Sequence, residues 1–286
     1  DSGNYNNSGD LVSYWDFNEG NGITLTDSSS NANNGVLTNM DVSSDWGTGA
    51  LFFDGVSDYV DVSAVKDEMV ATTDWSTSFW AKPDVSGFPE NDDDIFSVNT
   101  SSNSNVLTIG ITKTSVNGTS NGVFVYESGS GKVINGGAVS EDGWNHIAYS
   151  RFGNTGTLYL NGVSQGTHVT GYSFSSNDKW SLGGEFDPSG ISNEYAGLLD
   201  EVTIWDETLS AADVAALYNF GSGLDASADS GNYNGSSDLV TYWKFNDSSG
   251  VTLTDSSSNS NNGTLTNMDG SSDWVTSGLS LVDPTE

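Results

Sequence analysis

Residues 144–163, WNHIAYSRFGNTGTLYLNGV, decide the fold of this chain. Apolar and polar residues alternate in Trp144–Arg151 and again in Gly156–Leu160, as they do in strands that bury one face. Asn154-Thr155-Gly156 lies between the two runs and Asn161-Gly162 follows them. Asn and Gly tolerate the positive φ angles of tight hairpin turns, so the stretch predicts two antiparallel strands and a turn into a third.

The same pattern continues outward in both directions. Short apolar and aromatic runs, separated by clusters of Gly, Asn, Ser and Asp, predict further strands at 11–17, 50–53, 59–62, 78–82, 95–98, 106–112, 122–126, 179–182 and 198–205. One helix is predicted at 210–218, where Ser210 can cap the first turn and Asp213 is the third helical residue. Many strands with one late helix predict an all-β, two-sheet antiparallel jelly-roll sandwich.

An internal repeat divides the chain. Residues 1–46 return at 229–274 with a constant offset of 228, and Trp15, for example, corresponds to Trp243. The Gly/Ser/Asp-rich stretch between the helix and the second copy predicts an interdomain linker. We therefore expect a linker at 1–9, one sandwich at 10–220, a linker at 221–238 and a partial second repeat at 239–286. Such a repeat is typical of a tandem array of modules.

The charge balance excludes several partners. Asp and Glu number 39 against 7 Lys and Arg, for a net charge of −32. Nucleic acid and anionic membrane surfaces need a basic footprint, so neither is an expected partner. No run of about 18 apolar residues is present to predict a membrane-spanning helix. The acidic surface fits a soluble, extracellular, saline setting, and it can also hold cations. The absence of Cys excludes disulfides.

Five separated blocks of this sequence follow one another in the order that is typical of a known domain family. Within residues 10–220 they are, in chain order, LVSYWDFNEGNGITLTDSSSNANNGVLTN, ALFFDGVSDYVDV, STSFWAKPD, GWNHIAYSRFGNTGTLYLNGV and YAGLLDEVTIWDETLSAADVAALY. Together they resemble the laminin-G-like, concanavalin A-like jelly-roll domain. The resemblance implies two opposed sheets, a bound calcium in many members, and recognition of glycans or other extracellular ligands. The second copy resembles only the opening block.

Calcium is the expected cofactor. Ca²⁺ prefers six to eight oxygen ligands from carboxylates, amides and turn carbonyls. The polar loop that begins at Asp27 offers such oxygens, and Asp54-Gly55 follows an apolar strand. The resemblance implies that the residues around Asp54 and the Asp of the LDEV block, Asp200, lie close together. We therefore expect a site formed by Asp27, Asp54, the Gly55 carbonyl and Asp200. The alternative is that Asp27 and its neighbours form Asx turns, as Asp, Asn and Ser do in polar loops.

Weaker signals mark a ligand surface. An acidic cluster lies between two predicted strands and consists of Asp92, Asp93 and Asp94. It either holds a loop calcium that bridges to a sugar or is a solvated loop tip. Aromatic rings near loops can stack on a sugar face, and the candidates are Trp75, Phe88, Tyr172, Phe186 and Tyr195.

Catalysis is not expected. Neither His146 nor His168 is part of a plausible nucleophile arrangement, and no Gly-x-Ser-x-Gly turn is present. Glycoside hydrolysis needs two carboxylates at a defined separation, and the strand motif that carries them in related hydrolases is missing.

The sequence therefore predicts a non-enzymatic, calcium-binding adhesion or carbohydrate-recognition module at the cell surface, whose partner is a glycan or other surface ligand. A second hypothesis is a subunit of an extracellular filament, in which residues 229–286 pack on or donate strands to a second copy of the chain. A third is an ancillary domain of a polysaccharide-degrading enzyme.

Overall fold

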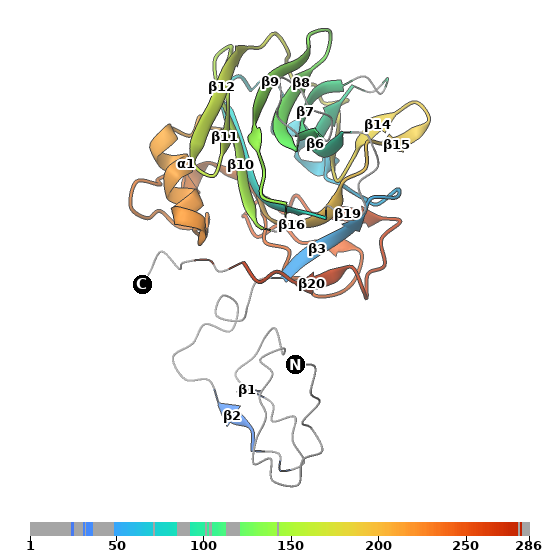
Figure 1. Cartoon of the computed structure of the whole chain (residues 1–286), viewed down its shortest axis with the longest axis vertical. Helices are drawn as coiled ribbons and strands as arrows, with labels where there is room; N and C mark the ends of the chain where they lie inside the picture. The colour runs from blue at the N-terminus through green and yellow to red at the C-terminus, as the bar shows by residue number, and fades with distance from the viewer. Residues whose placement is uncertain are drawn as a thin grey trace. The chain divides into compact units, whose positions relative to one another are not determined.

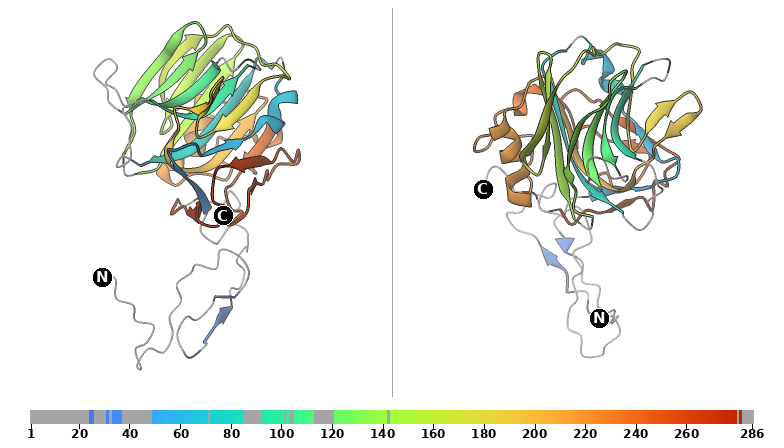
Figure 2. Two further views of the ribbon diagram at one scale, coloured as in Figure 1. Left: turned by 90° about the vertical axis from the view of Figure 1, so that its right-hand side faces the viewer. Right: turned by 45° about the horizontal axis from the view of Figure 1, so that its top comes forward.

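The computed structural model describes residues 24–25, 31, 33–36, 49–70, 72–84, 92–100, 102, 105–112, 121–141, 143–279 and 281. Two compact units divide the chain, Asp1–Thr48 and Gly49–Glu286. In the first unit, strands β1 (Thr24–Leu25) and β2 (Gly35–Val36) pair antiparallel. The second unit is a sandwich of two antiparallel sheets (Figures 1 and 2), so the predicted fold class is confirmed.

The first sheet carries the helix on its outer face, and we call it the helix-side sheet. In spatial order its strands are β12 (Val163–Val169), β11 (Thr155–Leu160), β10 (Asn145–Phe152), β5 (Trp75–Pro83), β16 (Ala196–Trp205), β3 (Gly49–Asp54) and β20 (Trp274–Thr276). β16 is long enough to pair with β3 along its first half and with β17 (Leu239–Trp243) along its second.

The second sheet carries a small hairpin on its outer face, and we call it the hairpin-side sheet. Its order is β18 (Thr252–Leu253), β19 (Gly263–Thr266), β4 (Tyr59–Asp61), β13 (Lys179–Leu182), β6 (Asp93–Asn99), β7 (Asn105–Thr112), β8 (Gly122–Glu127) and β9 (Gly131–Ala138). The hairpin is β14 (Glu185–Asp187) with β15 (Gly190–Ser192). A 3-10 turn at Ser63–Asp67 follows β4.

The core fills the space between the sheets. Alternate residues of both sheets point inward, as the period of two requires, and aromatic side chains supply much of the volume. The ring of Trp75 lies 5.2 Å from that of Phe174, which lies 4.7 Å from that of Trp180. All three are buried.

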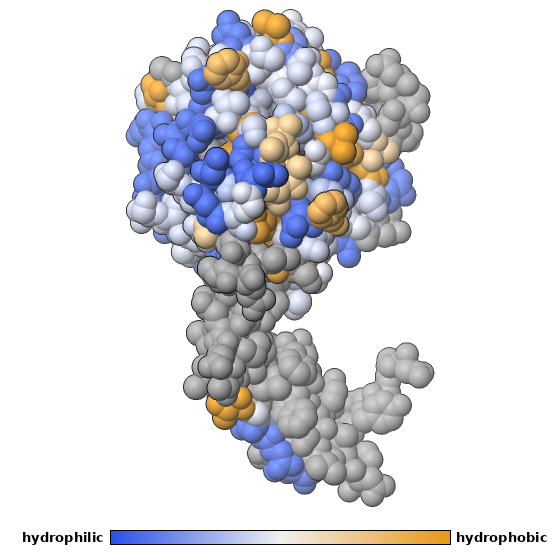
Figure 3. All heavy atoms as spheres, turned by 90° about the vertical axis from the view of Figure 1, so that its left-hand side faces the viewer, coloured by the Kyte–Doolittle hydropathy of each residue, from blue (hydrophilic) through white to orange (hydrophobic). Residues whose placement is uncertain are grey.

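A second, smaller cluster lies outside the helix-side sheet. Helix α1 (Ala211–Tyr218) begins with a capping box between Ser210 and Asp213, as the sequence predicted, and buries Val214 and Leu217. Short 3-10 turns follow at Asn219–Gly221 and Ser236–Asp238. Trp205 of β16 donates to the hydroxyl of Tyr233 at 3.1 Å beneath this cover. Figure 3 views the face that carries α1, where hydrophobic residues lie singly among hydrophilic ones.

The sequence predicted that a linker at 221–238 separates two domains, and the structure differs from this prediction. Strands β17 to β20, which belong to the second copy of the repeat, complete both sheets of the same sandwich, and Gly49–Glu286 forms one compact unit. The physical reason is burial: Trp243, Phe245 and Leu253 join the main core and would otherwise face water. The copy thus closes the sandwich of its own chain. Among the described residues, no helix is long and apolar enough to cross a membrane.

Candidate functional site

The hairpin-side sheet brings together some of the predicted ligand residues. Phe186 of β14 packs edge-on against Tyr59 at 5.3 Å, and the Lys179 ammonium lies 5.1 Å from its ring centre. The Phe186 carbonyl accepts a hydrogen bond from the side chain of Asn99 at 3.0 Å. Phe186 remains partly exposed. Among the predicted aromatics that the structure describes, it is the one that lies at a surface beside the predicted acidic cluster, and Phe88 lies outside the described residues.

The acidic cluster is not a solvated tip. Asp93 and Asp94 begin β6 and are buried, and only Asp92 keeps appreciable exposure. Asn193 donates both to Asp94, at 3.1 Å, and to Glu185, at 3.0 Å. Burial first, and the nearby Glu185 second, raise the pKa of Asp94 well above its usual value. Asn193 thus bridges the two carboxyl groups and fixes their geometry.

Asp92 has a partner of its own. Lys132 of β9 places its ammonium 2.6 Å from Asp92 Oδ2, and the same ammonium lies 4.5 Å from the ring centre of Phe124. The three consecutive acids therefore have different environments: Asp92 is in an ion pair, and Asp93 and Asp94 belong to the buried face.

Two predicted ligand contacts are corrected by the structure. Trp75 begins β5 instead of lying in a loop, and its ring is fully buried in the core. Tyr195 is also fully buried, packs on Phe53 and donates its hydroxyl to the Leu198 carbonyl at 3.1 Å. A ring enclosed in this way presents no face on which a sugar can stack.

The predicted calcium ligands are not brought together in the described residues. Asp54 pairs with Ala196 on β16, whereas Asp200 lies four residues further along the same strand, about 13 Å away at the usual strand rise. The buried carboxylate of Asp200 accepts from Ser277 at 2.5 Å. Gly55 occupies a turn with φ of 76°. Within the described part of the chain, no three His, Cys, Asp or Glu residues form a metal-binding group.

Asp27 lies outside the described residues, but its copy Asp255 is described. The two oxygens of Asp255 accept four hydrogen bonds of 2.7–2.9 Å, from the amides of Tyr242, Ser257 and Asn261 and from the Ser257 hydroxyl. Such a carboxylate forms an Asx turn and fixes the loop to β17. At Asp255 the structure thus agrees with the Asx-turn alternative.

A different acidic turn lies beside Asp54. Asp54 accepts from the Val56 amide at 2.6 Å, and Asp58 accepts from the Asp54 amide at 3.1 Å. Burial raises the pKa of Asp58 to about 6, and the charges of Asp54 and Asp273 add to this effect. The sequence analysis did not identify Asp58 or Asp273.

A partly polar groove lies on the surface of the sandwich. It has a volume of about 410 Å³ and lies between the ends of β8 and β12 and the segment that follows β12, lined by Thr100, Val106, Glu127, Ser128, Ser130, Val169, Gly171, Tyr172 and Ser173. Val169 is 71% exposed, and the half-buried Tyr172 ring is held against Arg151 at 4.6 Å. The lining therefore combines serines with apolar and aromatic side chains.

Glu127 fixes the groove's shape. Its Oε1 accepts from the Thr170 hydroxyl at 2.5 Å and from the Gly171 amide at 2.9 Å, and its Oε2 lies 2.7 Å from His168 Nε2. The side chain is 7% exposed, so both oxygens are engaged within the protein. Sequence reasoning missed this residue because its partners lie 41 to 45 positions away, where no local pattern links them.

The family model described as the concanavalin A-like lectin/glucanases superfamily matches residues 54–215, which is more than half of the chain. This chain belongs to that superfamily. The matched range contains the groove, the hairpin and most of both sheets. The resemblance seen in the sequence is therefore confirmed, and the jelly-roll fold with it.

Solved structures share this fold. A SAP-like pentraxin from Limulus polyphemus is 19% identical, with a TM-score of 0.51 over 69% of this chain and 91% of its own. A Bacteroides ovatus protein described as a candidate carbohydrate binding protein is 16% identical, with a TM-score of 0.54 over 85% of this chain and 65% of its own. The CBM40 of a Ruminococcus gnavus IT-sialidase, bound to α2,3 sialyllactose, has a TM-score of 0.46 and 16% identity, covering 60% of this chain and all of its own. A comparison with curated proteins finds no match.

Proposed function

We propose that this chain is a non-enzymatic carbohydrate-recognition module, and that its glycan binds in the groove between the ends of β8 and β12. The observation that carries this proposal is the lining of the groove, which combines three serines with the exposed Val169 and with Tyr172. A pyranose presents hydroxyls at its rim and C–H surface on its faces, and this lining complements both.

The electrostatics of the groove support binding without bond cleavage. Hydrolysis needs an acid and a base or nucleophile, two carboxyl groups about 5 to 9.5 Å apart. Glu127 is the one carboxylate of the lining, and both of its oxygens already accept hydrogen bonds. Its role in the proposal is to hold residues 170–172 in place for the ligand.

The setting that we propose is extracellular or at a cell surface, where glycans are exposed and where a net charge of −32 is tolerated at high salt. Adhesion to a glycan-bearing surface is the corresponding biological role. The acidic composition and the lectin-like superfamily support this setting.

Calcium stays a prediction, and we propose that the carboxylates of Asp54 and Asp58, with turn carbonyls as further oxygen ligands, are the place to look for it. A divalent cation there would offset the charge of Asp54, which adds to the effect of burial in raising the pKa of Asp58. A thermal melt with Ca²⁺ and with EGTA tests this, because a ligand of the folded state raises the midpoint. The Asp58→Asn variant should lose any calcium-dependent increase, and equal midpoints in native protein would refute the site.

A glycan array identifies the ligand class, and a pair of matched variants locates the site. Val169→Asp places a charge in the groove, whereas Val163→Asp places the same charge at the other end of β12; the two valines are 71% and 63% exposed. We expect Val169→Asp to reduce binding at least tenfold and Val163→Asp to leave it unchanged, with equal melting temperatures. Equal binding by both variants would exclude the groove, and an array without any bound glycan would exclude the function.

A further inference from the structure

The second copy of the repeat occupies a definite site on the sandwich, which we call the closing slot. Its walls are β3, β4 and the second half of β16. β17 pairs with β16, β19 with β4 and β20 with β3, so one segment completes both sheets. In addition, the Phe52 amide donates to the Asp273 carbonyl at 2.7 Å, and Asn267 donates to the Ser57 carbonyl at 3.0 Å.

The buried apolar side chains of the second copy are all duplicated near the N-terminus. Of 46 aligned positions 11 differ, so 35 are identical (46 − 11). The nine apolar residues of 229–274 that are buried in the core clusters are Tyr233, Val240, Tyr242, Trp243, Phe245, Leu253, Leu265, Met268 and Trp274. All nine are identical in the first copy, as Tyr5, Val12, Tyr14, Trp15, Phe17, Leu25, Leu37, Met40 and Trp46. The apolar burial that drives docking is therefore available twice in one chain.

The described hairpin of the first unit supplies a second observation. β1 and β2 pair Thr24 with Val36, and β18 and β19 pair Thr252 with Thr264. The two pairs differ by the repeat offset of 228, so the first copy forms its hairpin in the register that the slot requires.

The connection between the first copy and β3 is also short enough for the first copy to pair with β3. Trp274 lies opposite Leu51 and Val275 opposite Ala50. In the first copy the equivalents are Trp46 and Gly47, which leaves Thr48 and Gly49 as a two-residue hairpin loop before Ala50. Two-residue loops are the commonest hairpin connections, and Gly suits their φ angles.

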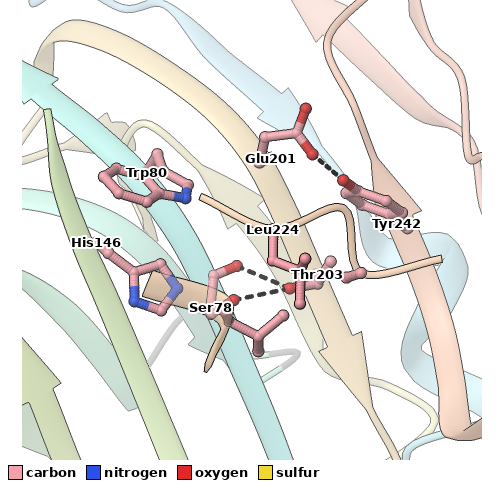
Figure 4. A pocket seen from close by; sticks show the side chains of 9 residues that line it. Ser78, Trp80, His146, Glu201, Thr203, Leu224 and Tyr242 are labelled. Carbon is pink, nitrogen blue, oxygen red and sulfur yellow. Dashed lines mark hydrogen bonds between the residues drawn. The ribbon is translucent and has the colours of Figure 1, made fainter. Parts of the chain in front are cut away.

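The 11 differences decide between the copies. Most lie at exposed positions, but Lys244 places its ammonium 2.7 Å from Asp225 Oδ2 and also acts on the buried Glu201. The first copy has Asp16 there. Glu201 accepts a hydrogen bond from Tyr242 beside a cavity of about 10 Å³, with Trp80 and His146 opposite (Figure 4). A carboxylate in place of Lys244 would add repulsion to this enclosed acid.

A steric difference between the copies also favours the C-terminal copy. A Cβ at Gly270 would lie 2.6 Å from the Gly250 carbonyl oxygen, a backbone atom. The first copy has Val42 at this position, so its docking requires a shift of that loop. Charge and packing therefore both favour the C-terminal copy.

We propose that the closing slot can accept either copy of the opening block of its own chain, and that the charge of Lys244 gives residues 229–274 precedence over residues 1–46. This goes beyond carbohydrate recognition: the sandwich is a binding site for a duplicated β-segment of its own chain. Its failure would leave the groove proposal untouched, because none of the slot residues line the groove.

Disulfide trapping measures the occupancy directly, because the chain contains no Cys. Asp61 pairs with Thr264, whose counterpart in the first copy is Val36. In a variant carrying Asp61→Cys, Val36→Cys and Thr264→Cys, the thiol at 61 can bond to only one of the other two. Peptide mapping after mild oxidation gives the ratio of the two bonds.

In the otherwise native chain we expect at least tenfold more of the 61–264 bond. Adding the exchange Lys244→Asp with Asp16→Lys should raise the share of the 61–36 bond at least tenfold. Ser248→Asp, a new charge at an exposed position of the same copy, is the matched control and should leave the ratio unchanged. Circular dichroism establishes that each variant is folded.

Three results would overturn the proposal. A 61–36 bond absent from both backgrounds would show that the slot rejects the first copy. A ratio that ignores the charge exchange would remove the role of Lys244. Disulfide-linked dimers whose yield rises with protein concentration would show that a second chain, and not the same chain, supplies the segment.

Discussion

The outer faces of the two sheets have different covers. The helix-side sheet is covered by an apolar cluster in which Trp205, Tyr233 and Leu217 are almost fully buried. The hairpin-side sheet is covered by β14, β15 and their flanking residues, which add polar contacts to the one aromatic contact of Phe186 with Tyr59. Ser181 donates to the Gly184 carbonyl at 2.7 Å, and Asn193 bridges Asp94 and Glu185. Apolar burial stabilises strongly and without direction, whereas a polar cover contributes less and fixes geometry.

Removing the centre of the apolar cover should have the largest effect. Trp205→Ala deletes a fully buried ring and leaves the Tyr233 hydroxyl without its donor. We expect a loss of about 3–5 kcal/mol in the free energy of unfolding, the usual cost of truncating a buried Trp. Urea unfolding followed by Trp fluorescence measures it. A loss below about 1 kcal/mol would show that the cover contributes little to the sandwich.

The buried histidine on the helix side should make the protein sensitive to acid. Burial lowers the pKa of His146 to about 3 from its ordinary value of 6.5. Because the pKa of this histidine is lower in the folded than in the unfolded state, its contribution to stability is complete above the unfolded pKa. The contribution is lost as pH falls below 6.5, where the unfolded state binds a proton and the folded state does not. Well between the two pKa values the loss approaches about 1.4 kcal/mol per pH unit.

The His146→Gln variant, which cannot be protonated, should remove that slope between pH 6 and pH 4. Melting temperatures in parallel buffers give the comparison, and the native protein at pH 8 is the reference. An identical slope in variant and native protein would show that other groups bind the proton.

The hairpin side should respond to pH with the opposite sign. Because the pKa of Asp94 is raised on folding, its contribution is complete below the unfolded pKa, near 4, and is lost as pH rises. Asp94→Asn, which carries no charge at this position, should therefore increase stability at pH 7. Asp92→Asn is the matched control; it breaks the partly exposed pair with Lys132 and should cost less than about 1 kcal/mol. A destabilised Asp94→Asn variant would contradict the raised pKa of Asp94.

These contrasts also separate what the sequence could predict from what it could not. Alternation located the strands with a buried face, and Ser210 with Asp213 located the helix, because both signals are local. β9 was missed, since GKVINGGA lacks buried apolar alternation, and β12 was indicated only by the Asn161-Gly162 turn that precedes it. Trp75 was assigned to a loop because the polar residues before it resemble a turn, yet it begins β5.

Long-range pairing explains the remaining differences. The repeat was visible at once, but identity between two copies cannot say which copy a sheet accepts. That choice depends on contacts such as Lys244 with Asp225 and Ser277 with Asp200, which no local pattern reveals. The contact of Glu127 with His168 and Thr170, which forms the groove, is of the same kind.

The smallest effect is expected on the hairpin side, and it separates the two candidate ligand surfaces. Phe186→Ala removes a partly exposed ring that touches Tyr59 and Lys179, so it should cost about 1 kcal/mol or less, well below Trp205→Ala. Its glycan binding should equal that of the native protein, because Phe186 is not in the lining of the groove. Isothermal titration with the glycan found on the array gives both affinity and stoichiometry. A loss of affinity in Phe186→Ala, together with normal affinity in Val169→Asp, would move the ligand to the hairpin-side sheet, where the acidic cluster and this aromatic meet.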